Sequence, residues 1–251
     1  MTLAGLPLLD VVVFSVAVFT AAFVTGVAGF AFGLIAAAIW LHVLTPVQSA
    51  VLVTAYAIIV QGYATWKLKH AIRWRRVLPM LIGGLIGIPL GIELLRLVPA
   101  HSVRIGVGAF LIAFSLYNLL KPKMPQFPGE RPISDGGIGV LSGVLAGSAG
   151  FATLLPVIWS SLRGWPRDEQ RAVFQPTGVL IFVATAAWFG GTGTIDTPTI
   201  RLFAIGLPAL ALGTWLGLSL YGRLNEASFR KVVLIVLLAS GLALIVPTMI
   251  R

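Results

Sequence analysis

The stretch GSAGF at residues 147–151 repeats an earlier stretch, GVAGF at residues 26–30. Each copy interrupts a run of apolar residues that would otherwise be long enough to form a membrane-spanning helix. Paired glycines let the backbone leave helical geometry, and many transporters with internal repeats build a binding site from such interrupted helices. The duplication therefore predicts a membrane transporter with two related halves.

The composition places the chain in a lipid bilayer. Of its 251 residues, 58% are hydrophobic and 10% are charged, and the mean hydropathy is +0.98. These values exclude an ordinary water-soluble domain. The net charge of +10 comes from Lys and Arg in short loops between apolar runs, which is a pattern of membrane topology and not of nucleic-acid binding. We expect an all-α, multi-pass protein of the cytoplasmic (inner) membrane.

Further matched positions follow the glycine breaks in the same order in both halves. Pro46 and Gln48 correspond to Pro166 and Gln170, with two additional residues in the second copy. A proline-rich, charged stretch separates the halves and indicates an exposed connection. The predicted division is a first repeat at residues 1–120, a cytoplasmic linker at residues 121–133 and a second repeat at residues 134–251.

Each half is predicted to contain one interrupted segment followed by three uninterrupted helices. The interrupted segments cover residues 8–41 and 134–162. The uninterrupted helices are expected at residues 46–66, 77–97, 103–120, 169–189, 199–220 and 229–249.

The basic residues distinguish two ways of placing the interrupted segments. If each segment crosses the membrane once, the chain forms eight simple spans, and its 18 Lys and Arg residues divide almost evenly, ten to eight. If each segment is a re-entrant helical hairpin, fourteen of the 18 lie on one side. Basic residues of short loops concentrate in the cytoplasm, which favours hairpins. A hairpin and three spans make an odd number of crossings, so the halves would then be inverted repeats. Eight simple spans are the alternative.

The glycine breaks are the candidate binding site for a small anionic substrate. A half-helix that follows a break begins with free N–H groups at the positive end of its dipole, and these attract anions. Hydroxyl and amide side chains near the breaks could add hydrogen bonds; they are Thr25, Gln48, Ser148, Thr153, Gln170, Gln175 and Thr177, with Gln61 and Tyr56 as weaker candidates. In the alternative interpretation, the glycines only permit close helix packing, and the polar side chains only bond neighbouring helices.

Other chemistry finds no support in the residues. The chain has no cysteine, no His, Asp or Glu pair has metal-ligand spacing, and no nucleophile stands in a recognisable arrangement with a base. We therefore expect no metal, no cofactor and no enzymatic activity. An anion channel and a non-transporting membrane scaffold or assembly factor are the competing functions.

The twin Gly-x-Ala-Gly-Phe breaks, the two halves and the short charged linker resemble the sulfite exporter family TauE/SafE over nearly the whole chain. The resemblance implies a secondary transporter or exporter of a small sulfur anion, such as sulfite, sulfoacetate or a related sulfonate, across the cytoplasmic membrane. It also implies that the site is framed by Gly26, Gly29, Phe30, Gly147, Gly150 and Phe151. The expected partners are this anion and the lipid bilayer, without nucleic acid, and a homodimer is compatible with them.

Overall fold

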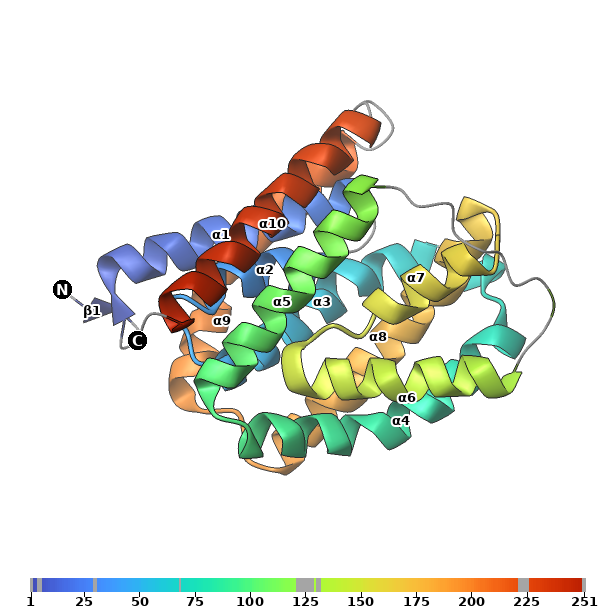
Figure 1. Ribbon diagram of the computed structural model, residues 1–251, viewed down its shortest axis with the longest axis horizontal. Helices are drawn as coiled ribbons and strands as arrows, with labels where there is room; N and C mark the ends of the chain where they lie inside the picture. Colours follow the sequence, from blue (N-terminus) through green and yellow to red (C-terminus); the bar gives the residue numbers. More distant parts are fainter. Residues whose placement is uncertain are drawn as a thin grey trace. The chain divides into compact units, whose positions relative to one another are not determined.

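The computed structural model is helical in almost all of the residues that it describes, which are 2–3, 6–28, 31–67, 69–120, 129, 132–220 and 226–249 (Figure 1). A short antiparallel strand pair, β1 (Thr2–Leu3) and β2 (Leu6–Pro7), comes first. The first half continues with α1 (Leu8–Ala28), α2 (Phe32–Trp40), α3 (Pro46–Lys67), the 3-10 turn η1 (Lys69–Ala71), α4 (Trp74–Leu97) and α5 (Ala100–Leu120). The second half contains α6 (Pro132–Ala149), α7 (Leu154–Leu162), α8 (Arg167–Gly191), α9 (Thr197–Ser219) and α10 (Glu226–Met249).

The helices occur in the predicted order. All six predicted uninterrupted helices are present, with ends that differ by only a few residues from the sequence-based ranges. Among the described residues, six helices are long and apolar enough to cross a membrane: α1, α3, α4, α5, α8 and α9. These observations confirm an all-helical, multi-pass membrane protein.

Both interrupted segments are broken helices that fold back on themselves. The return helices α2 and α7 are each nine residues long. Trp40 of α2 stacks on Phe14 of α1 with ring centroids 5.0 Å apart, and its Nε1 donates to the Phe14 carbonyl oxygen at 3.3 Å. In the second half, Trp159 Nε1 of α7 donates to Asp135 Oδ1 of α6 at 2.7 Å. In each pair, a residue of the return helix thus meets one in the first part of the preceding helix.

Two compact units divide the chain differently from its sequence repeats. The first unit contains Met1–Ser49, Val98–Lys123 and Asp196–Arg251, and the second contains Ala50–Leu97 and Met124–Ile195. In the first unit α9 packs against α1, and in the second α4 packs against α6 (Figure 1). Each broken helix is therefore covered by an unbroken helix from the other half of the sequence.

Glycines bring α4 and α6 to backbone contact. They recur at every fourth residue on both helices, at Gly83, Gly87 and Gly91 on α4 and at Gly139, Gly143 and Gly147 on α6. A Cβ atom on Gly87 would lie only 2.9 Å from the carbonyl carbon of Val140. Small residues of this kind drive packing in membranes, where lipid removes the hydrophobic advantage of helix association.

An exposed apolar stripe runs along another part of the α4 surface. Its members are large aliphatic residues spaced by four positions, namely Leu78, Ile82, Ile86, Leu90 and Leu94. Such a contiguous stripe would be unfavourable in water, but it matches the hydrocarbon core of a bilayer. The glycine contacts and the aliphatic stripe together define a protein-facing and a lipid-facing side of α4.

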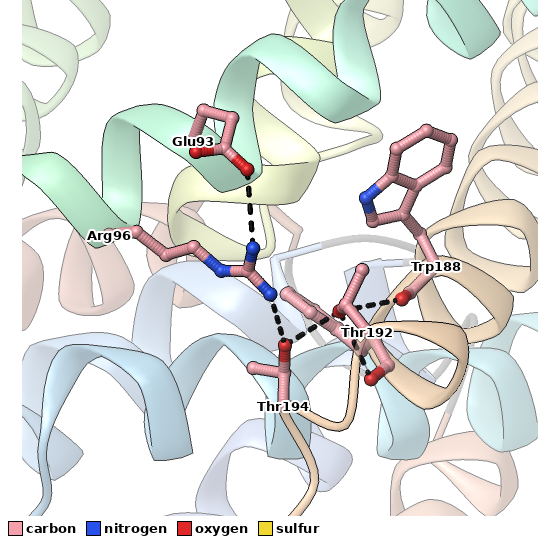
Figure 2. Close-up of polar contacts among 6 residues, drawn as sticks. Glu93, Arg96, Trp188, Thr192 and Thr194 are labelled. Carbon is pink, nitrogen blue, oxygen red and sulfur yellow. Dashed lines mark hydrogen bonds and ion pairs between the residues drawn. The ribbon is translucent and has the colours of Figure 1, made fainter.

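Helices α4 and α8 run side by side in the same direction. At their starts, Arg76 Nη1 lies 2.7 Å from Glu169 Oε1. At their ends, Arg96 Nη2 donates to Thr194 Oγ1 at 3.1 Å, and Figure 2 shows Arg96 reaching both Thr194 and Glu93. Only residues 68–73 join the end of α3 to the start of α4, so the end of α3 lies near the starts of α4 and α8. Helix α3 therefore runs in the opposite direction to both.

Candidate functional site

The second glycine break ends α6 in a left-handed turn. Gly150 has a φ of +76°, a conformation that L side chains rarely adopt. Its N–H donates to the Ala146 carbonyl at 2.9 Å, and the N–H of Phe151 donates to the Leu145 carbonyl at 3.1 Å. A Cβ atom on Gly150 would lie 2.6 Å from Val53 Cγ1 of α3. Backbone conformation and packing therefore both require glycine at this position.

The return helix α7 begins with free backbone donors. The Leu154 N–H reaches the Phe151 carbonyl only at 3.4 Å. The N–H groups of Ala152, Thr153 and Leu155 have no backbone acceptor in the described part of the chain. Because the first turn of a helix also carries roughly half a positive charge, this end of α7 favours an electronegative ligand.

Two buried polar side chains lie beside this end of α7. Thr153 is 6% exposed, and its hydroxyl makes no capping hydrogen bond. Gln61 of α3 is 2% exposed, and its Oε1 has no hydrogen-bond partner within the described ranges. Gly178 of α8 brings the two together, since a Cβ atom there would contact the Thr153 methyl group and lie 3.6 Å from Gln61 Oε1.

We call Gln61, Thr153, Gly178 and the N–H groups of residues 152, 153 and 155 the α7 cluster. A buried polar atom without a partner costs about 1–3 kcal/mol. Several such atoms at one helix end are therefore expected to bind water or a hydrogen-bonding ligand. The α7 cluster has the donors and the acceptor that such a ligand needs.

No charged side chain comes from the helical stretches around the α7 cluster. Residues 46–66, 141–162 and 172–191 contain no Lys, Arg, His, Asp or Glu. The basic residues that directly flank these stretches are Lys67, Arg163 and Arg171. Arg163 is buried at the far end of α7, where its guanidinium lies 5.6 Å from the centroid of the Trp159 ring. The α7 cluster thus offers dipoles and hydrogen-bonding groups, and these three stretches supply no counter-ion.

The predicted polar turn at residues 175–177 lies within the continuous helix α8. Pro176 has no N–H, so the Ala172 carbonyl one turn earlier is open to another donor, and the Arg73 N–H lies 3.4 Å from it. Thr177 is fully buried and donates its hydroxyl to the carbonyl one turn earlier at 2.8 Å. Gln175 is also buried. Thr177 directly precedes Gly178, which places this turn next to the α7 cluster.

The matched glutamines Gln48 and Gln170 lie at helix starts and not at a break. Gln48 and Thr45 exchange hydrogen bonds of 3.2 and 3.3 Å, forming a capping box for α3. Gln170 Nε2 donates to the Trp165 carbonyl at 2.8 Å, and its Oε1 accepts from the Ser161 hydroxyl at 3.4 Å. Along the chain, a whole return helix separates each glutamine from its break. A role for them in substrate binding stays a prediction.

The first glycine of each break lies in a contact between helices. A Cβ atom on Gly26 would lie 2.9 Å from Gly217 Cα of α9, and one on Gly147 would lie 2.6 Å from the Ile88 carbonyl oxygen of α4. Ser148, which follows Gly147, donates its hydroxyl to the carbonyl one turn earlier at 2.8 Å. These contacts correspond to the packing interpretation of the glycines, and a part in binding stays a prediction.

The first break differs chemically from the second. Gly29 and Phe30 lie outside the described residues, and the next residue, Ala31, has a φ of +86°. No polar side chain occurs from residue 31 to residue 39. Thr25, just before the break, donates its hydroxyl to the Ala21 carbonyl within its own helix at 2.7 Å. Polar groups for a solute are therefore concentrated at the second break.

Sequence reasoning gave Gln61 a low rank and missed Gly178. An amide in an otherwise apolar spanning helix is a signal of a polar contact, but the sequence does not show which helix it faces. Nothing in the spacing of α3 and α8 indicates that Gln61 and Gly178 meet at the start of α7.

A family model described as sulfite exporter TauE/SafE matches residues 14–244 of the chain. The chain therefore belongs to the sulfite exporter TauE/SafE family, which is a family of membrane transporters of sulfur anions. This match confirms the resemblance found in the sequence, and a transporter family agrees with the expectation that the chain is not an enzyme. No curated protein and no solved structure matches the chain.

Proposed function

We propose that this family member is a secondary transporter that carries a small sulfur oxyanion, such as sulfite, sulfoacetate or a related sulfonate, across the cytoplasmic membrane. The observation that carries the proposal is the α7 cluster, in which backbone donors, the Thr153 hydroxyl and the partnerless oxygen of Gln61 meet at a half-helix end. Anions with several oxygens bind well at helix N-termini because the N–H groups and the dipole act together.

The absence of charge in the stretches around the α7 cluster fits a carrier. A transported ion must bind strongly enough to enter and weakly enough to leave. A buried Lys or Arg would hold an anion by a charge-assisted hydrogen bond about twice as strong as a neutral one. Dipoles and neutral hydrogen bonds allow the anion to be bound and then released on the other side.

We further propose that the two halves are inverted repeats and that both hairpins re-enter the membrane from their starting side. Helices α3 and α8 occupy corresponding places in the two halves, and within the second unit they run in opposite directions. The uneven distribution of Lys and Arg in the hairpin topology supports the same arrangement.

The topology can be tested by labelling, because the chain has no cysteine of its own. Single cysteines at the exposed positions Ile133, Asp168 and Thr192 mark the start of α6, the start of α8 and the end of α8. The proposal expects Ile133→Cys and Asp168→Cys to react with a membrane-impermeant reagent from the same side, and Thr192→Cys from the other. Labelling of Ile133→Cys and Asp168→Cys from opposite sides would exclude the hairpin.

Transport itself can be measured in proteoliposomes loaded with sulfite, sulfoacetate, sulfate or acetate. Thr153→Val keeps the shape of the side chain and removes its hydroxyl, while Gly178→Ala fills the space beside it. Both should lower the flux of the sulfur anion at equal amounts of folded protein. Matched controls on α8 are Thr185→Val, whose hydroxyl bonds its own helix, and Gly190→Ala, where a Cβ atom would meet nothing within 4 Å.

The same vesicles separate a carrier from an anion channel. A carrier moves labelled anion faster when unlabelled anion is present on the far side, and its flux saturates. A channel shows neither property. Parent protein without flux for any sulfur anion would contradict the transport proposal and favour a scaffold.

A further inference from the structure

We propose that the preferred substrate is a sulfur oxyanion with a single negative charge and a hydrogen-bond donor of its own, such as hydrogensulfite or a hydroxysulfonate. The inference rests on the proposed function and narrows its substrate class, because it places sulfoacetate and the sulfite dianion, which carry two negative charges and no donor, below singly charged anions that have one. It follows from two properties of the cluster, its unpaired acceptor and its lack of a cation.

The unpaired acceptor is Gln61 Oε1. It is buried beside α7 and accepts no hydrogen bond from the described residues. The oxygens of sulfite dianion or of a simple alkanesulfonate can only accept, so they could bond the N–H groups of α7 but could not satisfy this oxygen. A substrate with an O–H group could donate to Gln61 Oε1 while its other oxygens accept from the Ala152 and Thr153 N–H groups.

The lack of a cation limits the charge that the site can hold. The helical stretches that meet there contain no Lys, Arg or His, and the start of one helix supplies only about half a positive charge. The energy of removing an ion from water rises with the square of its charge, so a dianion is far more costly to bury than a monoanion. The site therefore favours the protonated, singly charged form.

A pair of sulfonates with equal charge tests the donor directly. In proteoliposomes, 2-hydroxyethanesulfonate should be transported at least about 10-fold more efficiently than ethanesulfonate, because only the first can satisfy the buried acceptor. The preference should fall towards unity in Gln61→Met, which keeps the length of the side chain. The readout is the ratio of the transport efficiencies of the two sulfonates in one preparation. A smaller amount of folded variant lowers both efficiencies equally and leaves this ratio unchanged.

The pH dependence of sulfite flux is a second measurement that needs no variant. Sulfite flux, relative to ethanesulfonate flux, should rise as the pH falls through the second pKa of sulfurous acid. Equal transport of the two sulfonates, or a flux that follows the dianion, would overturn the inference and leave the proposed transporter function intact. A parent protein that moves no sulfur anion would overturn both.

Discussion

Gly150→Ala should lower the free energy of unfolding by about 2–5 kcal/mol, because the substitution is unfavourable in two independent ways. A φ of +76° is a left-handed conformation, which costs a residue with a Cβ atom roughly 1–2 kcal/mol. The new Cβ atom would also lie 2.6 Å from Val53 Cγ1 and 2.8 Å from Val53 Cβ. Overpacking of this kind costs about 1–3 kcal/mol.

A double-mutant cycle with Val53→Ala separates the two contributions. Val53→Ala removes the nearer atom, so part of the steric cost should disappear in the double variant, whereas the backbone strain should remain. We expect a coupling of about 0.5–3 kcal/mol, with the two changes less harmful together than the sum of their separate effects. The measurement is reversible unfolding of all four proteins in mixed micelles of a mild detergent and dodecyl sulfate.

The results bear directly on the geometry of the second break. Additive effects of the two substitutions would refute the contact between Gly150 and α3. A Gly150→Ala variant as stable as the parent protein would refute the left-handed turn as well, and with it the local geometry that starts α7 beside Gln61.

Three further predictions concern other parts of the fold. Ala31→Gly should raise the free energy of unfolding by up to about 1 kcal/mol. A φ of +86° strains alanine, and the relief of that strain outweighs the greater chain entropy that glycine loses on folding. A variant less stable than the parent protein would contradict the left-handed turn at Ala31. Gly87→Ala should be about 1–3 kcal/mol less stable than Gly190→Ala in the same unfolding assay, because only the first meets backbone atoms of a neighbouring helix; equal stabilities would argue against close packing of α4 and α6. Partial loss of hydration, and secondarily the charge of Arg104, lowers the pKa of His42 below 6.5 although the side chain is partly exposed. The unfolded chain therefore binds the proton more readily, and stability should fall as the pH drops below 6.5. In His42→Gln the unfolding temperature should decrease less below pH 6.5 than it does in the parent protein. The same pH profile in both proteins would exclude a contribution of His42 to the pH dependence of stability.

Much of the architecture could be predicted because it depends on local properties of the chain. Runs of about 20 apolar residues identify spanning helices, and a glycine pair inside such a run identifies a break. Both breaks were located correctly: α6 ends at Ala149, α1 ends at Ala28, and a nine-residue helix follows each one. Family membership was also readable, since the two breaks are part of a pattern that extends over most of the chain.

The roles of individual site residues could be predicted less well. The sequence groups Gly147 and Gly150 in one motif, yet the first contacts α4 and the second ends α6. Gln48 and Gln170 occupy matched positions, but their side chains bond the start of their own helices or the turn before it. Gly147 lies within α6, whereas Gly150 lies just beyond its last residue in a left-handed turn. Two glycines of one motif therefore meet different neighbours.

The sequence by itself determined that this is a helical membrane protein with two broken segments, because hydropathy and glycine breaks act over a few turns of one helix. Only the tertiary structure decided that each break folds into a hairpin, that α4 covers α6 and α9 covers α1, and that Gln61 and Gly178 meet at the start of α7. Some of these contacts join residues more than a hundred positions apart in the chain. They depend on which helix faces fit together once backbones approach at glycine, and no local pattern in the chain records that fit.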